Sequence, residues 1–511
     1  MKKRQIVNIV NFIRDTEPRG PVDLVEPVRQ QIMLMKKHRL RGTFLLQYDA
    51  LIDPVYTDML RALGSEQFEF GVWCEIVEPQ CRAAGIPWRG RFSWDWHAQC
   101  GFPVGYAKPE REALADALFE KFREVFGAYP RVFGSWIFDS HTARYISDKY
   151  GLDAMCNCKE QYGTDGYTLW GGFYGQAYYP GRTNVFMPAQ TEAERLPVPL
   201  FRMLGSDPVY QYDLGMSAES GAQEKQGVIT LEPVYKGRGG GVPAWVDWFV
   251  RENFNGDCLT FGYAQAGQEN SFGWPAMKNG LEYQFGLFEK LRDEGRLEVE
   301  PLGETGRWFR QTWDDTPPSA ITARTAYDDP RKSSVWYCTK HYRINLFSDH
   351  GDFRIRDLHV FDERVPDPFE DRVCVSNEAA FETLPLADGN RHSGNGAVAG
   401  IRILRNGKPL AAGPLAFRDN GDGTARVDCG AFSFLLREDG FTVGSDGEFS
   451  LAYLFGRSDD HMPEPVYCGE KELIVRYGAA EYGLALEKGR FSGPLSADAE
   501  DGLIACRIIR K

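Results

Sequence analysis

Short apolar runs that end at a carboxylate recur along the first half of the chain. They are rich in the β-branched and aromatic residues that favour strands. The runs are IVNIVNFI before Asp15 and Glu17, TFLLQY before Asp49, FEFGVWC before Glu75, VFGSWIF before Asp139, and LTFGYAQAG before Glu269. In a barrel of parallel strands the active site is built at the carboxyl ends of the strands. We therefore expect these acids to converge on one pocket suited to acid/base chemistry on a polar substrate.

Amphipathic stretches of helical length separate most of these runs. The clearest is PEREALADALFEKFREVFG, which opens with Pro109 and acidic residues and ends at Gly127. We expect strands at 6–12, 43–47, 68–73, 131–137, 153–157, 198–204 and 258–263. We expect helices at 25–38, 55–63, 109–127, 141–150, 242–253 and 277–294, an aromatic loop at 78–107, and an irregular segment at 159–195. Strands that alternate with helices over seven or eight units predict an α/β fold, a (β/α)7-8 barrel.

The pattern changes after Trp313. The segment DDTPPSA is typical of a linker. Beyond residue 320, short alternating runs such as SSVWYCT, YRINLF and ELIVRYG are separated by turn signals such as NGDG and EDG. This pattern predicts an antiparallel β-sandwich. The sequence therefore predicts two domains, a barrel at 1–313 and a sandwich at 320–511.

Composition narrows the class of protein. The 511 residues carry a formal net charge of −13 and no run of Lys or Arg, so we expect no nucleic-acid partner. No apolar stretch reaches the roughly 20 residues that span a bilayer, and we expect no membrane partner. The N-terminal segment reads as the first strand rather than as a secretory leader. Eleven cysteines without paired CxxC spacing argue against a disulfide framework and favour a reducing cytoplasm.

Three acids are the candidates for catalysis. Glu75 follows a strand beside Trp73, and apolar surroundings would raise its pKa, as a general acid requires. Asp139 precedes a helix, so that capping of this helix is an equally good explanation of it. Glu269 follows small residues that would let a substrate approach the backbone. Glu75 and Glu269 could each instead be a solvated loop acid.

Aromatic side chains give an independent argument for a sugar substrate. Of the 12 tryptophans, all but Trp336 lie at or before Trp313, and Trp94 and Trp96 share one loop with charged residues. Aromatic faces beside hydrogen-bonding groups suit sugar rings, although some of these residues must pack the loops themselves. We expect a small-molecule or oligosaccharide substrate to contact Asp15, Arg19, Asp49, Trp73, Trp94, Asp95, Trp96, His97, His141 and Asp165.

A metal site has weak support in the sequence. His97 and His141 are the only histidines of the barrel half that the pattern places near the site, with Asp15, Asp95 or Asp139 to complete a set. No HxxxH or HExxH spacing is present. We therefore expect no metal and no cofactor, and keep a metal-dependent enzyme as an alternative.

The barrel half, roughly residues 1–300, resembles the polysaccharide deacetylases of NodB homology and glycoside hydrolase families 38 and 57. FEFGVWCEIV resembles the deacetylase strand that precedes a His-x-x-x-His metal pair, and FGAYPRVFGSWIFDSHTARYISDKYGLDA resembles the stretch that follows. This sequence departs from the pattern in two places. The two histidines would fall at Trp73 and Val77, and the acidic pair expected after the first strand is replaced by Arg14 and Asp15. In family 57 the catalytic acids follow strands four and seven, which the resemblance maps to Asp139 and Glu269 with the two acid types exchanged.

These observations favour a carbohydrate-active hydrolase, a metal-independent glycosidase in which two of Glu75, Asp139 and Glu269 act. One alternative is a metal-dependent carbohydrate deacetylase with ligands rearranged onto Asp15, His97 and His141. Another is a non-catalytic carbohydrate-binding protein. A homo-oligomer formed through the second domain is compatible with the sequence, but no pattern requires it.

Overall fold

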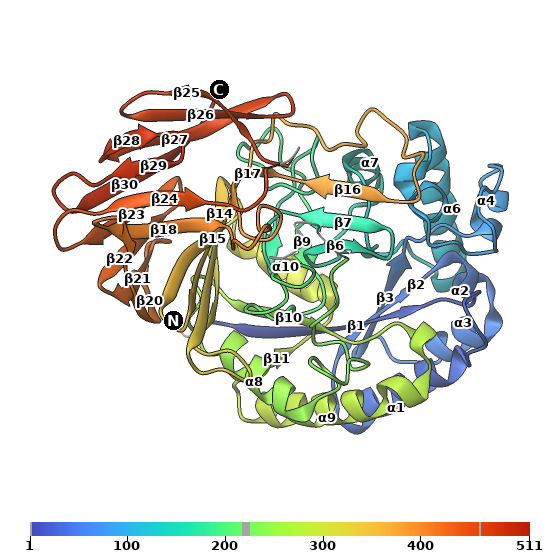
Figure 1. The fold of residues 1–511 in the computed structure, drawn as a ribbon. Helices are drawn as coiled ribbons and strands as arrows, with labels where there is room; N and C mark the ends of the chain where they lie inside the picture. The colour runs from blue at the N-terminus through green and yellow to red at the C-terminus, as the bar shows by residue number, and fades with distance from the viewer. Residues whose placement is uncertain (1–2, 217–224, 459–460) are drawn as a thin grey trace.

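A computed structural model describes residues 3–216, 225–458 and 461–511 (Figure 1). The first part of the chain curls one sheet into a barrel that helices surround, and the later part adds two antiparallel sheets. The helices are α1 (Val25–Lys37), α2 (Tyr48–Ile52), α3 (Pro54–Arg61), α4 (Glu78–Ala83), α5 (Ala98–Gly101), α6 (Lys108–Phe126), α7 (Ser140–Tyr150), α8 (Pro243–Asn253), α9 (Trp274–Asp293) and α10 (Leu302–Thr312), with short 3-10 turns at Pro103–Gly105 and Asn270–Phe272.

The barrel strands follow one another in space almost as they do in sequence. They are β1 (Gln5–Ile13), β2 (Gly42–Leu46), β3 (Phe68–Trp73), β4 (Val132–Gly134), β5 (Ala154–Asn157), β8 (Ala177–Tyr178), β9 (Leu200–Arg202), β10 (Gly262–Ala266) and β11 (Glu298–Val299). The sheet order is β10-β1-β2-β3-β4-β5-β9-β8, with β11 also paired to β1. Every neighbouring pair from β10 to β9 is parallel, and β8 is antiparallel to β9.

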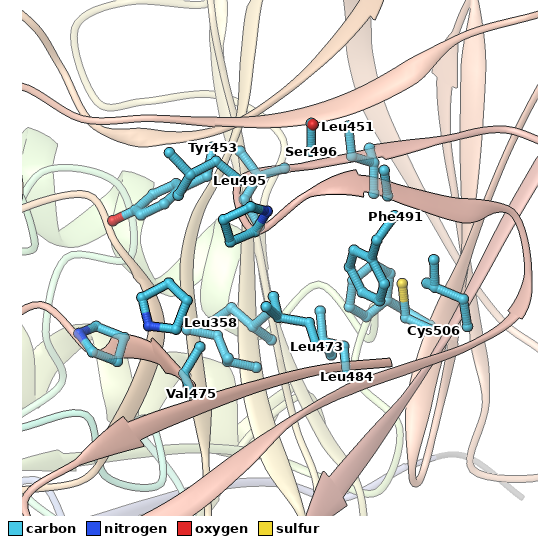
Figure 2. Close-up of a pocket in the computed structure, with 18 of the residues that line it drawn as sticks. Leu358, Leu451, Tyr453, Leu473, Val475, Leu484, Phe491, Leu495, Ser496 and Cys506 are labelled. Atoms are coloured by element: carbon cyan, nitrogen blue, oxygen red, sulfur yellow. The ribbon is translucent and has the colours of Figure 1, made fainter. Parts of the chain in front are cut away.

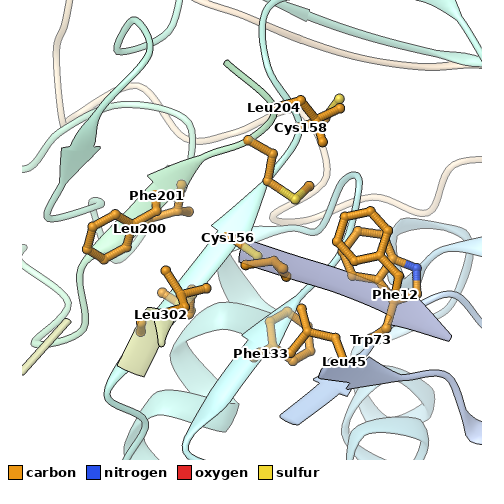
Figure 3. Packing of buried hydrophobic residues seen from close by; sticks show 14 of the residues in the cluster. Phe12, Leu45, Trp73, Phe133, Cys156, Cys158, Leu200, Phe201, Leu204 and Leu302 are labelled. Atoms are coloured by element: carbon orange, nitrogen blue, oxygen red, sulfur yellow. The ribbon is translucent and has the colours of Figure 1, made fainter. Parts of the chain in front are cut away.

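The barrel is incomplete between β9 and β10, which do not pair within the described residues. Side chains close this side instead, since the rings of Phe201 and Tyr263 lie 5.2 Å apart. Inside the barrel, Phe12 stacks on Trp73 at 4.2 Å, near Cys156 (Figure 3). Such an aromatic pair contributes about 0.5–1.5 kcal/mol beyond its burial. All nine residues of β1 are buried, as expected for a strand covered on both faces.

Helix α10 closes the end of the barrel where the strands begin. The backbone N–H of Leu302 donates to Thr43 Oγ1 at 2.9 Å, and that of Gly303 donates to Glu69 Oε2 at 2.9 Å. The Asn8 amide of β1 donates to Thr305 Oγ1 at 2.7 Å. Because α10 covers the amino ends of the strands, the loops at their carboxyl ends form the other face of the barrel.

Two antiparallel sheets follow the linker and pack their apolar faces into a second core. One has the order β12-β13-β14-β15-β18-β24-β29-β28, with β17 on β15 and β19 on β18, and the other has the order β20-β21-β22-β23-β30-β27-β26-β25. Figure 2 shows an apolar pocket in this core, lined in part by Leu358, Leu473 and Phe491.

The strands of these sheets have the following bounds: β12 (Ser319–Ala323), β13 (Lys332–Cys338), β14 (Tyr342–Asp349), β15 (Asp352–Val360), β17 (Leu384–Asp388), β18 (Gly400–Arg405), β19 (Lys408–Pro409), β20 (Ala412–Asp419), β21 (Ala425–Gly430), β22 (Phe432–Arg437), β23 (Gly440–Ser445), β24 (Ser450–Leu454), β25 (Glu464–Cys468), β26 (Glu472–Tyr477), β27 (Ala480–Lys488), β28 (Arg490–Gly493), β29 (Ser496–Asp498) and β30 (Leu503–Arg510).

The later part of the chain also contacts the loops of the barrel. Strand β16 (Ala379–Glu382) pairs in parallel with β7 (Tyr167–Trp170), which itself pairs with β6 (Gln161–Thr164). Trp336 stacks on Tyr174 with ring centroids 3.8 Å apart. These contacts fix the long segment between β5 and β9 against the second set of sheets.

The predicted fold class is confirmed: a (β/α) barrel precedes antiparallel sheets. Most expected helices lie within a few residues of their predicted bounds. The expected strand at 258–263 is wrong in position, since β10 spans Gly262–Ala266. The apolar start of that run serves another contact, because Leu259 packs against the core of the later sheets. The 131–137 strand is shorter than expected, and the 159–195 segment contains β6, β7 and β8.

All eleven cysteines are free thiols, and ten of them are buried. Their cytoplasmic setting stays a prediction. Within the ranges that the structure describes, no helix combines the length and apolar character needed to cross a membrane.

Candidate functional site

Three buried charged side chains meet at the carboxyl ends of β1, β3 and β10. Arg14 directly follows β1, Glu75 follows β3, and Glu269 follows β10; they are 3%, 2% and 5% exposed. Arg14 Nη2 donates to Glu75 Oε2 at 2.9 Å and to Glu269 Oε2 at 2.7 Å. One guanidinium nitrogen therefore holds two carboxylates that are almost 200 residues apart in the sequence.

Apolar surroundings set the protonation of this cluster. Burial raises the pKa of Glu75 to about 7, against the opposing charge of Arg14. Glu75 also accepts a hydrogen bond from the indole Nε1 of Trp73 at 2.7 Å. Burial opposes the charge of Arg14, but Glu269 and Glu75 more than compensate and raise its pKa. The arrangement thus holds a permanent positive charge beside an acid that is poised to exchange a proton near neutral pH.

The loops after β1 and β10 are locked to each other. The Asn270 side chain accepts from the Arg14 backbone N–H at 3.0 Å and donates to the Arg14 carbonyl at 2.8 Å. Gly267 has a φ of +110°, and a Cβ there would lie 2.1 Å from the carbonyl oxygen of Val10. Only glycine lets the loop that carries Glu269 approach β1 so closely. Ser271 Oγ then donates to the second oxygen of Glu269 at 2.7 Å.

Trp94 and Trp96 lie over the arginines of the cluster. The guanidinium of Arg14 is 4.1 Å from the ring centroid of Trp94, and that of Arg19 is 5.1 Å from it. Arg19 also lies 5.8 Å from Trp96, which is only partly buried. The loop is held by Asp95: burial opposes ionisation, but hydrogen bonds from Arg91 and a backbone N–H hold its pKa at about 2.

A second set of buried ionisable groups lies at the same end of the barrel. Lys159 follows β5, and burial lowers its pKa. Glu232 accepts from Thr230 Oγ1 at 2.8 Å and from the Gln268 amide at 3.3 Å. Burial raises the pKa of Glu232 to about 7, and the charges of Lys159 and Glu269 both act on it. These groups therefore belong to the surroundings of Glu269.

Asp139 has a structural set of partners. It caps α7 by accepting from the backbone N–H of Thr142 at 3.0 Å, and it is fully buried against Arg111 Nη1 at 2.7 Å. Arg111 Nη1 also donates a hydrogen bond to the Phe369 carbonyl at 2.8 Å. The capping explanation of Asp139 is thus confirmed, and its side-chain hydrogen-bond partners are Arg111 and Thr142 rather than Arg14.

The remaining predicted site residues contact several different partners. Asp49 accepts from the Asp15 backbone N–H at 2.9 Å, and burial raises the pKa of Asp49 to about 6. His97 lies 3.6 Å from Asp95. His141 Nε2 is 2.9 Å from Glu112 on α6.

Asp165 is exposed and occupies the two-residue turn between β6 and β7. Its φ is +55° and that of Gly166 is +81°. This is the Asp-Gly pattern of a type I′ hairpin turn, so the turn accounts for Asp165 without a ligand.

Within the described part of the chain, His97 pairs with Asp95 and His141 with Glu112, and neither pairs with Asp15. Among the described residues no group of three or more His, Cys, Asp or Glu side chains is arranged to hold a metal ion.

Several residues of the cluster did not emerge as site residues from the sequence. Arg14 was noted only as a departure from the deacetylase pattern, although it ends the same apolar run that leads to Asp15. Lys159 and Glu232 lie in irregular segments that carry no periodic signal. Trp136, whose ring packs edge-on against Trp73 at 5.0 Å, was hidden inside the run that leads to Asp139.

No model of a known protein family matches the chain, and no curated protein matches it. A solved structure does. A candidate glycoside hydrolase/deacetylase from Parabacteroides distasonis aligns with a TM-score of 0.57 and 15% identity, over 75% of this chain and 91% of that one. This chain therefore shares the fold of that structure. The resemblance to that barrel superfamily is confirmed as a likeness of fold.

Two further solved structures align more loosely. A candidate polysaccharide deacetylase from Mycobacterium smegmatis has a TM-score of 0.37 and 12% identity, over 61% of this chain and 92% of that chain. A GH57-type branching enzyme from Pyrococcus horikoshii has a TM-score of 0.33 and 11% identity, over 60% of this chain and 71% of that chain.

Proposed function

We propose that this protein is a retaining glycoside hydrolase that cleaves an oligosaccharide with Glu75 and Glu269 and without a metal ion. The single observation that carries the proposal is the pair of carboxylates on one nitrogen of Arg14, buried at the carboxyl ends of the barrel strands. The likeness of fold to a candidate glycoside hydrolase/deacetylase supports the substrate class.

The two acids have different surroundings, and these suggest their roles. Glu75, with its pKa raised to about 7 by burial, donates a proton to the leaving glycosidic oxygen. Glu269 accepts from both Arg14 and Ser271, which favours a carboxylate that attacks the anomeric carbon. In the second step Glu75 removes a proton from water, the oxygen of that water displaces Glu269 from the anomeric carbon, and both acids regain their starting states.

The separation of the acids favours retention of configuration. Both bound oxygens lie on the same Nη2 atom, at 2.9 and 2.7 Å, so they cannot be farther apart than these two bonds laid end to end. That limit is well short of the about 6.5–9.5 Å that an inverting enzyme needs for its water, and is close to the about 5–5.5 Å of retaining enzymes.

The metal-dependent deacetylase fits these contacts less well. It would need Asp15, His97 and His141 around one ion, whereas His97 lies beside Asp95 and His141 beside Glu112. Arg14 already supplies a positive charge between the two acids. A non-catalytic sugar-binding protein would have no use for an acid whose pKa is about 7, and the experiment below separates all three functions.

Hydrolysis of a panel of aryl α- and β-glycosides and of acetylated sugars, with and without a chelator, tests the proposal. We expect release of the aryl group that persists with chelator, and a first-formed sugar of the same anomeric configuration as the substrate, seen by proton NMR. Acetate release that the chelator abolishes would support the deacetylase instead. Sugar binding without any turnover would support the binding protein.

The pH dependence of kcat/KM should report the protonation of Glu75. Since burial raises its pKa to about 7, Glu75 stays protonated below that pH and loses its proton above it. We therefore expect kcat/KM to fall as the pH rises above about 7. Initial rates between pH 5 and 9 measure this; a rate that keeps rising to pH 9 would contradict the role of Glu75 as the acid.

A further inference from the structure

Lys159 is a buried amine on which the charges of Glu232, Asp165 and Glu160 act, but none of these carboxylates forms an ion pair with it. It is 3% exposed, and its Nζ has only two long contacts, the Glu160 carbonyl at 3.3 Å and the Gln161 amide oxygen at 3.4 Å. Within the described part of the chain no carboxylate lies within 4.0 Å of it. Both acceptors are neutral and at the outer limit of a hydrogen bond.

Burying an amine without an ion pair is unfavourable for the stability of the folded protein. Removing an ammonium group from water costs several kcal/mol when no opposite charge compensates, and buried lysines are normally paired. Arg202, close to Lys159 in the fold, shows the ordinary solution, since it lies 3.3 Å from Glu160. Lys159 has no such ion pair, and its two hydrogen bonds are long and go to neutral acceptors, which favours a stronger acceptor that a ligand brings.

The position of Lys159 links it to the proposed catalytic pair. The charge of Lys159 acts on Glu232, which also feels Glu269. Glu232 accepts from the side chain of Gln268, the residue before Glu269. Lys159 and Glu269 therefore flank the same buried carboxylate from two different strands of the barrel.

Other buried polar atoms at these strand ends also lack a hydrogen-bond partner among the described residues. Two of these atoms, Asn157 Oδ1 and Gln268 Oε1, are acceptors, and one, Arg14 Nη1, is a donor. Free acceptors match the hydroxyl groups of a sugar ring. Arg14 Nη1, which lies 3.8 Å from Glu17 Oε2 without a hydrogen bond, and the ammonium of Lys159 match oxygens that carry negative charge.

We propose that the substrate is a glycoside of a hexuronic acid, and that Lys159 binds the carboxylate of this sugar. The inference rests on the proposed function and names its substrate class. A neutral sugar would leave the ammonium with hydroxyl acceptors only, whereas a uronate would bring a carboxylate into direct contact with it. Below pH 7 the proton on Glu75 and that on Glu232 limit repulsion between the site and an anionic sugar.

Binding of free sugars separates this inference from catalysis. Isothermal titration calorimetry at pH 6 would compare glucuronic and galacturonic acids with glucose and galactose. The proteins would be the wild type, Lys159→Met, Lys159→Arg and the control Lys236→Met, which removes an exposed charge. We expect one uronic acid to bind the wild type at least about tenfold more tightly than its neutral counterpart, as one charge-assisted hydrogen bond allows.

Lys159→Met should abolish that preference, Lys159→Arg should retain part of it, and Lys236→Met should leave it unchanged. The melting temperature adds an independent readout. Because methionine removes an unpaired buried charge, Lys159→Met should melt at or above the wild-type temperature, whereas loss of a structural lysine would lower it.

Equal affinity for acidic and neutral sugars, or a uronate preference that survives in Lys159→Met, would overturn the inference. If uronate binding depends on Lys159 but no glycoside is cleaved, the proposed function fails and only the binding of a uronate by Lys159 stands. If glucosides and glucuronides are cleaved equally well, only the inference fails.

Discussion

Replacing Glu269 by glutamine is expected to lower kcat at least about 1,000-fold, because the amide cannot form the covalent bond to the anomeric carbon. Glu75→Gln should lower kcat about 100- to 10,000-fold for substrates with poor leaving groups, since it removes the proton donor. For an aryl glycoside with an acidic phenol the loss in Glu75→Gln should be much smaller. Steady-state kinetics with two such leaving groups measure both effects.

The configuration of the product formed with an added anion identifies which glutamate is the nucleophile and which is the acid. Small anions such as azide should restore turnover in Glu269→Ala with an inverted glycosyl azide, and in Glu75→Ala with a retained one. The matched control is Glu298→Gln, a glutamate bound to Arg4 at 2.8 Å at the opposite end of β1. It should keep near-wild-type kinetics. Near-wild-type turnover of Glu75→Gln and Glu269→Gln together would remove both acids from the mechanism.

The barrel was predictable because its strands are buried on both faces. IVNIVNFI and FEFGVWC are nearly continuous apolar runs, and the helix of PEREALADALFEKFREVFG has both a start and a stop signal. The hydrophobic pattern gave a wrong strand position where an apolar residue packs outside the barrel. Leu259 looks like the start of a strand, yet it packs on the later sheets, so β10 begins only at Gly262.

The site was predictable only as far as strand ends could locate it. The rule that acids at these ends converge brought Glu75 and Glu269 together correctly in space. It did not separate them from Asp139, which follows a strand in the same way. What distinguishes Asp139 is a long-range contact with Arg111 on α6, and no local pattern carries that information.

Two residues that depart from the deacetylase pattern, Trp73 and Arg14, contact the same acid in the structure. The position where the resemblance expects a metal histidine carries Trp73, and one position of the expected acidic pair carries Arg14. Both residues donate hydrogen bonds to Glu75 Oε2, at 2.7 and 2.9 Å. The residues at these two positions therefore hold an acid.

Arg14→Met is expected to destabilise the barrel by about 3–5 kcal/mol at pH 8, because it leaves buried carboxylates without their counter-charge. The loss should shrink at pH 5.5. Glu75, with its pKa raised to about 7 from an ordinary 4.5, is protonated in the folded protein below pH 7 and so needs Arg14 less. Above pH 7 Glu75 is ionised and depends on Arg14 for its counter-charge, so the loss is largest there.

Urea unfolding at the two pH values, followed by tryptophan fluorescence, measures this difference. The signal reports mainly on the barrel, since all tryptophans but Trp336 lie at or before Trp313. Arg19→Met is the matched control: its side chain is 44% exposed and pairs with Glu17, so we expect a loss of at most about 1 kcal/mol. A loss for Arg14→Met that is independent of pH, or no larger than that of Arg19→Met, would mean that Arg14 does not hold the two acids together, and the proposed catalytic pair would lose its physical basis.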